Sequence, residues 1–214
     1  MNTDRIYSVL VPTIRPIVRA TNRPRIAQFE AAPLAARRVV FLGDSITQGG
    51  FWDAWFPELL TLNRGVNGDT TTDVIHRLDS AIFKPAAVSL LIGTNDLHGK
   101  PRERILSGIS DRTHEIINRI QDASPDTTIL LNSVLPRTAH LAARIQELNA
   151  HYRTIAQKTG ATYVDLWPAL ADGLALHKEY TQDNLHLVSA GYRAWTGVLR
   201  PHLAPFAVSG PGEK

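Results

Sequence analysis

A serine follows an apolar run of the sequence, at a point where a strand is expected to end. Val39–Leu42 is β-branched and aromatic without polar alternation, which is typical of a strand buried on both faces of a parallel sheet. Gly43 allows a turn, so Ser45 would lie at the carboxyl end of the strand, where open α/β sheets bind ligands. Ser45 is therefore a candidate nucleophile, although a helix cap formed by Asp44 or Ser45 would explain the same pattern.

Near the C-terminus, a histidine stands three residues after an acid, as Asp183 and His186. In a short turn this spacing lets the carboxylate accept a hydrogen bond from one imidazole nitrogen while the other nitrogen faces a nucleophile. The chain has eight histidines, and His186 is the one with an acid at this offset in an expected loop. The pair is thus a candidate general base with its orienting acid.

Two further polar segments are expected at strand ends. In Asn63–Thr70, two glycines around Asn67 expose backbone N–H groups, although an ordinary turn followed by a helix cap would explain the segment as well. Gly93–Asp96 follows another apolar run and brings an amide, Asn95, to the end of that strand. A cap or turn accounts for Asp96 but less well for Asn95.

These segments must be positioned by alternating strands and helices. The expected strands are Val39–Leu42, Leu60–Asn63, Ala86–Ile92, Thr128–Val134 and Ala161–Leu166. The expected helices are Asp69–Ala81, Arg102–Asp122, Thr138–Lys158 with Gly160 as its stop signal, and a last one that begins at Ser189 and is interrupted by Pro201. This alternation predicts an α/β fold, with a parallel sheet between two layers of helices.

The chain divides by composition into an arm, a domain and a tail. Of 214 residues, 43% are hydrophobic and 20% are charged, which suits one well-filled domain, expected at residues 38–205, with a polar tail at 206–214. The net charge is +3, but the arm at residues 1–37 and Arg38 together carry +5, so the rest of the chain carries −2. That distribution argues against a nucleic-acid partner. The apolar residues of the arm predict packing on its own domain or on a second copy, as in a homo-oligomer.

Several classes of protein are not supported by the sequence. The absence of cysteine excludes disulfides, thiol nucleophiles and cysteine metal sites, and H-E-x-x-H spacing is missing, so we expect neither metal nor cofactor. G-x-S-x-G, the elbow of the α/β-hydrolases, is also missing. We expect no membrane span and no secretion signal, and hence a cytoplasmic protein.

Four segments in order resemble the conserved blocks of the SGNH (GDSL-type) hydrolases. They are Gly43–Ile46, Asn63–Gly68, Gly93–Asp96 and Asp183–His186, and the match runs from about residue 39 to 203. The pattern Asn-x-Gly-x-x-Gly-Asp-Thr-Thr and the run Val134–Arg137 are similar, within this family, to brain-type platelet-activating-factor acetylhydrolase catalytic subunits and related bacterial acetyl esterases.

The resemblance implies a flavodoxin-like three-layer sandwich with about five parallel strands. It also implies that Ser45 is the nucleophile, His186 the general base and Asp183 the orienting carboxylate. The backbone N–H groups of Ser45 and Gly65 and the side-chain amide of Asn95 would form the oxyanion hole. Each such donor is worth about 3–4 kcal/mol in the transition state.

The family further implies a serine esterase that acts on a small-molecule ester. We expect short acyl chains, because the blocks are compactly spaced with no lid domain between them. Candidate substrate contacts are Trp52, Asn67, His98 and Arg137. Aromatic residues spaced like Trp52 and its neighbours are also typical of a core, and His98 and Arg137 could equally be solvated loop residues. Thioesterase or acyltransfer activity at the same site, or a non-catalytic binding module with this fold, are the alternatives.

Overall fold

The computed structural model describes residues 3–33, 35–98 and 102–208, with side chains for 17–33, 35–97 and 106–208. Its centre is a sheet of five parallel strands in the order β2-β1-β3-β4-β5. The strands are β1 (Val39–Gly43), β2 (Thr61–Gly65), β3 (Ala87–Leu91), β4 (Thr128–Asn132) and β5 (Thr162–Val164). This is the flavodoxin-like order, in which the direction of winding switches between β1 and β3. The expected α/β fold is confirmed.

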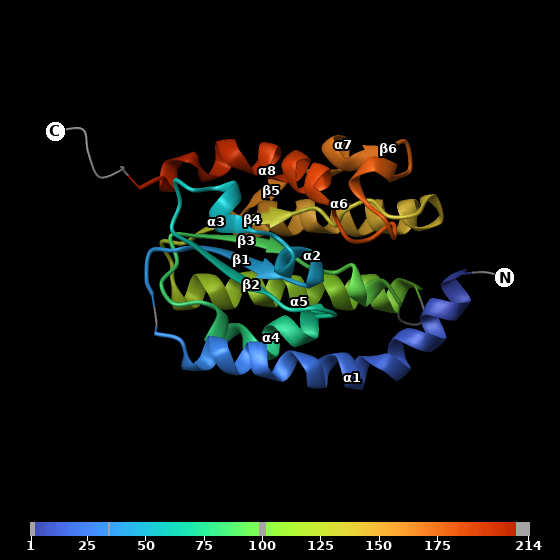
Figure 1. Cartoon of the computed structure of the whole chain (residues 1–214), viewed down its shortest axis with the longest axis horizontal. Coiled ribbons are helices and arrows are strands. Elements are labelled where there is room, and N and C mark those ends of the chain that lie inside the picture. Colours follow the sequence, from blue (N-terminus) through green and yellow to red (C-terminus); the bar gives the residue numbers. More distant parts are fainter. Residues whose placement is uncertain (1–2, 34, 99–101, 209–214) are drawn as a thin grey trace.

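Helices cover both faces of the sheet, with α4 and α5 on one side and α8 on the other (Figure 1). The long helices are α1 (Thr3–Ala31), α4 (Thr71–Ala81), α5 (Arg102–Ala123), α6 (Ala142–Thr159) and α8 (Ser189–Leu203). The short ones are α2 (Ser45–Gln48), α3 (Trp52–Trp55), α7 (Trp167–Leu170), η1 (Asn95–His98), η2 (Ala139–Leu141), η3 (Lys178–Tyr180) and η4 (Ala204–Phe206). A small hairpin pairs β6 (Ala171–Asp172) with β7 (Ala175–Leu176).

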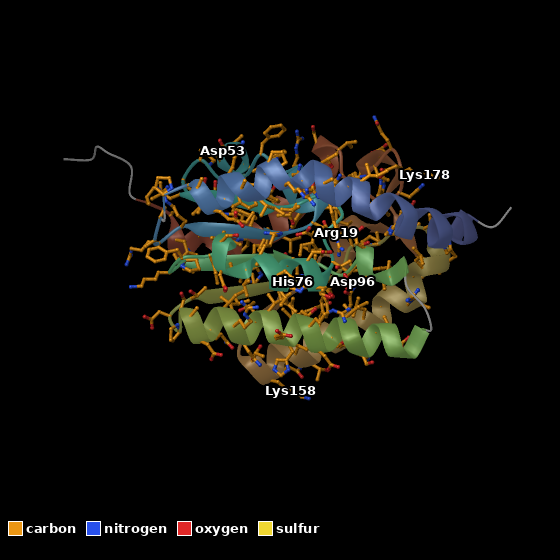
Figure 2. All side chains as sticks on the ribbon, turned by 90° about the horizontal axis from the view of Figure 1, so that it is seen from below. Arg19, Asp53, His76, Asp96, Lys158 and Lys178 are labelled. Atoms are coloured by element: carbon orange, nitrogen blue, oxygen red, sulfur yellow. The ribbon has the colours of Figure 1, made fainter. Side chains whose placement is uncertain are left out.

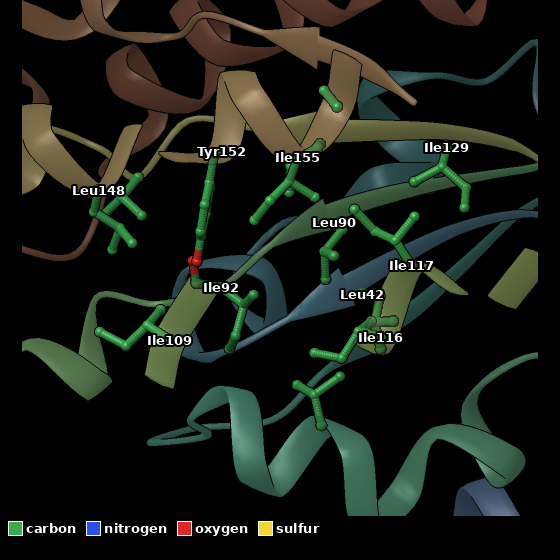
Figure 3. Close-up of a cluster of buried hydrophobic side chains, with 14 of the residues drawn as sticks. Leu42, Leu90, Ile92, Ile109, Ile116, Ile117, Ile129, Leu148, Tyr152 and Ile155 are labelled. Atoms are coloured by element: carbon green, nitrogen blue, oxygen red, sulfur yellow. The ribbon is translucent and has the colours of Figure 1, made fainter. Parts of the chain in front are cut away.

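Alternate residues of the strands face two separate cores. Val40 and Leu42 of β1 pack with α4, α5 and α6 in the core drawn in Figure 3. Val39 and Phe41 point the opposite way and pack with α3, α7 and α8, where the Phe41 and Trp52 rings stack at 3.9 Å. Because β1 is buried on both faces, it carries no polar residue until it ends.

The arm is largely one helix, α1, which lies alongside α4 on the outside of the molecule (Figures 1 and 2). Arg19 Nη2 of α1 lies 2.5 Å from Asp73 Oδ1 of α4. Phe29, only 7% exposed, lies beneath the guanidinium groups of Arg25 and Arg64, 5.1 and 4.4 Å from its ring centre. The arm therefore packs on its own domain.

The expected elements correspond to observed ones, with two informative differences. The segment expected as one helix from Thr138 begins as the 3₁₀ turn η2 before α6, and α6 ends at Gly160, which has a left-handed φ of 75° as expected. Pro201 does not interrupt α8, which continues to Leu203. A proline this close to a helix end removes one hydrogen bond of the last turns, and the Ala204 N–H still reaches the Arg200 carbonyl.

Candidate active site

Ser45 lies at the carboxyl end of β1 as the first residue of α2. Gly43, two residues before it, permits the close approach of β3, because a Cβ at this position would lie 2.1 Å from the Leu91 carbonyl oxygen. Asp44 is fully buried and caps α2, its Oδ1 accepting from the Ile46 N–H at 2.9 Å. The cap is thus Asp44, and Ser45 is left as the partly exposed hydroxyl of the turn.

The turn at residues 181–187 brings a histidine to this serine. His186 Nε2 lies 2.9 Å from Ser45 Oγ, and His186 Nδ1 lies 2.6 Å from Asp183 Oδ2. A bridge between Thr181 and Leu187 closes the base of the turn, and Asn184 takes a left-handed φ of 60° within it. Serine, imidazole and carboxylate therefore form one chain of hydrogen bonds.

The carboxylate of Asp183 is held in its charged form. Partial burial alone would raise its pKa, but the hydrogen bonds from the His186 ring and from the backbone N–H groups of His186 and Leu185 lower the pKa to about 2. An ionised carboxylate can only accept, so the proton between the two side chains belongs to His186 Nδ1. In a neutral imidazole with its proton on Nδ1, Nε2 is an acceptor for the Ser45 hydroxyl.

The structure does not fit the expected oxyanion role of Gly65. Its backbone N–H already donates to Asn63 Oδ1 at 3.0 Å. A Cβ at position 65 would lie 2.2 Å from the Gln48 backbone nitrogen, so this glycine permits the close approach of β2 to α2. Its physical role is packing, and the N–H is engaged within the loop itself.

Gly68, three residues further on, is the other glycine beside Asn67, and the sequence did not point to it as an oxyanion donor. It has a left-handed φ of 74°, and within the described residues its N–H makes no hydrogen bond. Asn95 lies beside it, since Asn95 Nδ2 donates to the Asp69 carbonyl at 2.9 Å. The sequence does hold a signal for Gly68, which is the second glycine of the segment, directly before the residues that lead into α4.

Two buried acids attach the loops that carry Gly68 and Asn95 to α4. Asp69 Oδ2 lies 2.6 Å from Arg77 Nε, and burial raises the pKa of Asp69 to about 6 against the lowering effect of that arginine. Asp96 accepts from the backbone N–H and the hydroxyl of Thr71 at 3.0 and 2.6 Å, and burial raises its pKa too. Asp96 thus caps α4 from the neighbouring loop.

The structure places the four residues expected to contact the substrate in different surroundings. Trp52 is 1% exposed, stacks on Phe41 and donates from Nε1 to the Thr47 carbonyl at 3.0 Å, so it is a core residue and the expected contact is wrong. Arg137 is 7% exposed, with Nη1 3.5 Å from Thr94 Oγ1. Asn67 is exposed, and its role stays a prediction. The side chain of His98 lies outside the described ones.

Neither a metal cluster nor a membrane span emerges from the described residues. No three His, Asp or Glu side chains among them gather as metal ligands would. In the same residues, no helix is long and apolar enough to cross a bilayer.

Comparisons with known proteins point to one family. The profile of the GDSL-like lipase/acylhydrolase family matches residues 41–194. Platelet-activating factor acetylhydrolase IB subunit alpha1 from Pongo abelii is 31% identical over 167 residues, which cover 72% of this chain and 70% of that protein. The Homo sapiens subunit is 30% identical with the same coverage.

Solved structures share the fold. A structure from Streptococcus pneumonia superposes with a TM-score of 0.81 at 25% identity, covering 91% of this chain and 98% of that one. A catalytic mutant of the acetylxylan esterase Axe2 from Geobacillus stearothermophilus superposes with a TM-score of 0.66 at 19% identity, over 83% and 99% of the two chains. The second likeness concerns the fold alone.

Proposed function

Because the chain belongs to the GDSL-like lipase/acylhydrolase family and is a hydrolase that acts on esters, we propose that it cleaves short acyl esters through a serine acyl-enzyme. The observation that carries the proposal is the chain of contacts from Ser45 Oγ to His186 Nε2 at 2.9 Å and from His186 Nδ1 to Asp183 Oδ2 at 2.6 Å. Nucleophile, base and orienting acid are thus within hydrogen-bond reach before any substrate binds.

In the first half of the reaction, Ser45 Oγ attacks the ester carbonyl while His186 Nε2 takes the hydroxyl proton. The ionised Asp183 holds the Nδ1 proton and stabilises the imidazolium that forms. His186 then gives the Nε2 proton to the leaving alcohol, and the acyl group stays on Ser45. In the second half, water replaces the alcohol, and the acid and Ser45 are released by the same proton transfers.

The negative oxygen of the tetrahedral intermediate needs fixed donors. We assign them to the backbone N–H groups of Ser45 and Gly68 and to the Nδ2 amide of Asn95, with Gly68 in place of the expected Gly65. Asn95 Nδ2 carries two hydrogens, and the bond to the Asp69 carbonyl uses one and leaves the other for the substrate. The Gly65 N–H is engaged by Asn63 Oδ1.

Two observations support short, acetyl-type acyl groups. The relatives that are about 30% identical are named for the removal of an acetyl group. Between β1 and α8, the described chain contains no inserted domain that could enclose a long acyl chain. The first aromatic side chains after Ser45 in the sequence give no such enclosure either, since Trp52 is buried in the core and Phe51 is 75% exposed.

Thioester cleavage and acyl transfer would use the same acyl-enzyme and differ only in the group that leaves or accepts. A non-catalytic binding module is the alternative from another class. The hydrogen bonds that join Ser45, His186 and Asp183 disfavour a binding module. Binding alone does not require a hydroxyl, an imidazole and a carboxylate to be linked in this way.

Acetate release by the wild type and by Ser45→Ala tests the proposal. A matched control exists, because Ser110 Oγ lies 2.7 Å from His151 Nδ1 between α5 and α6. We expect Ser45→Ala to lose activity by about 10⁴-fold or more and Ser110→Ala to keep it. Equal release by the wild type and Ser45→Ala would remove the serine mechanism. A preference for p-nitrophenyl esters longer than octanoate over the acetate would refute the short acyl specificity.

A further inference from the structure

Helix α1 reaches the loop that carries the proposed oxyanion donor Gly68. Asn22 Nδ2 donates to the Asn67 carbonyl at 2.6 Å, and Arg25 Nε donates to the Gly65 carbonyl at 2.7 Å. A Cβ at Gly68 would lie 3.0 Å from Val18 Cγ1, so α1 also packs directly against this glycine. Three successive turns of α1 therefore touch a loop at least 40 residues away in sequence.

Of these contacts, the one from Asn22 acts on the peptide unit of the donor itself. The carbonyl of Asn67 and the N–H of Gly68 belong to the same planar peptide, which is trans. In a trans peptide the C=O and the N–H point in opposite directions. With the Asn67 carbonyl turned toward α1, the Gly68 N–H is directed away from α1.

The other side of Asn67 is fixed as well. The Asn67 N–H donates to Gln48 Oε1 at 2.8 Å, and Gln48 belongs to α2, the helix that begins at Ser45. The loop is thus held between α1 and the nucleophile's own helix. Asn22 is 7% exposed, so its hydrogen bond is not exchanged freely with water.

We propose that Asn22 is a positioning residue for catalysis, which aims the Gly68 N–H at the oxyanion. This inference rests on the proposed function. A hydrogen bond to the carbonyl also polarises the peptide and strengthens its N–H as a donor. Asn22 itself touches neither substrate nor reacting atoms, and it lies outside residues 41–194, the part of the chain that matches the family.

Hydrolysis of p-nitrophenyl acetate by Asn22→Ala and Asn22→Asp tests the assignment. Both lack the donor, and the aspartate keeps the shape of asparagine while presenting only acceptors to the Asn67 carbonyl. We expect kcat per folded molecule to fall by roughly tenfold, and KM to change by less than about twofold. The fall in kcat should be smaller than the roughly 10²–10³-fold loss caused by removing a whole oxyanion donor, because the Gly68 N–H is still present in both variants.

Arg19→Ala is the matched control on the same helix. It removes the 2.5 Å contact between α1 and Asp73 without touching the loop. We expect it to lower the melting temperature slightly and to leave kcat within about twofold of the wild type. A fall in kcat equal to that of Asn22→Ala would mean that general attachment of α1, rather than the Asn22 amide, matters, and would overturn the proposal.

Binding of butylboronic acid gives a second readout, because its tetrahedral adduct with the serine carries an oxygen in the oxyanion position. Its Kd should rise in Asn22→Ala by about the same factor as kcat falls. If the wild type is active through Ser45 but Asn22→Ala keeps kcat and boronate affinity, the positioning role alone is refuted. If the wild type hydrolyses the ester no faster than Ser45→Ala, the proposed function fails and this assignment falls with it.

Discussion

Oδ2 of Asp183 lies 2.6 Å from Nδ1 of His186, and the two residues are only three positions apart in the chain. The two side chains are therefore one local unit, whose shape is fixed by the turn and by the backbone N–H groups that also bond to Asp183. Ser45 comes from the other end of the domain, 141 residues away. Mutations in the turn should thus affect His186, the proposed base, without disturbing Ser45, the proposed nucleophile.

Replacing Asp183 with asparagine should lower kcat by about 10³–10⁴-fold. An amide can donate to Nδ1 and so favours the tautomer whose Nε2 carries a proton and cannot accept from Ser45. Steady-state kinetics on an acetyl ester measure the loss. Asp126→Asn makes the same change at an exposed loop before β4 and should be neutral. Equal activity of the two variants would contradict the orienting role.

Replacing Asn95 with alanine should lower turnover by on the order of 100-fold or more. The variant loses the donor proposed for the oxyanion and also the bond to the Asp69 carbonyl. Thermal melting separates the two effects. A lower melting temperature with unchanged kcat per folded molecule would leave Asn95 with a structural role only.

The buried carboxyl of Asp44 should make stability depend on pH. Burial raises its pKa to about 7 from the ordinary 3.8, so the native state keeps a proton that the unfolded chain has lost. Stability therefore falls as pH rises between these values. Asp44→Asn keeps an acceptor for the Ile46 N–H and removes the charge.

Urea unfolding of this variant and the wild type from about pH 4 to about pH 7 measures the effect. The difference in the free energy of unfolding should shift in favour of Asp44→Asn by about 1.4 kcal/mol for each pH unit over which the native state keeps the extra proton. A difference that stays constant with pH would mean that Asp44 is ionised throughout.

Replacing Phe29 with alanine should destabilise the protein by about 3 kcal/mol, because this ring of α1 is buried beneath Arg25 of the same helix and Arg64 of β2. Denaturant unfolding measures the change. Phe83→Ala removes the same ring from a position that is 39% exposed and should cost much less. A loss of stability for Phe29→Ala as small as the one expected for Phe83→Ala would show that α1 is not part of the folded unit. Assembly into homo-oligomers stays a prediction, to be measured by light scattering of the full chain.

The three central strands of the sheet could be predicted from the sequence because β1, β3 and β4 are short, mainly apolar runs. Helix α1 could not, since it continues through Pro12, Pro16 and Pro24, residues that each remove a backbone donor. Its stability comes from contacts with α4 and the loop at residues 65–69, and such long-range packing leaves no local pattern.

The same limit applies within the site. Ser45, Asp183, His186 and Asn95 were identified because their residue types and their places at strand ends are unusual. Gly65 and Gly68 are chemically identical, and only the partner of each N–H separates them. Trp52 was ambiguous for a similar reason, because an aromatic residue after the nucleophile can face either the substrate or the core.

The distance in sequence between Ser45 and His186 has a kinetic consequence. Native contacts between residues so far apart form late in folding, because the entropy of closing a long loop must be overcome first. A partly folded chain can hold the Asp183–His186 turn and still have no activated serine. Recovery of ester hydrolysis during refolding would then report the docking of the C-terminal part of the chain onto β1, whereas recovery of helical circular dichroism would come earlier.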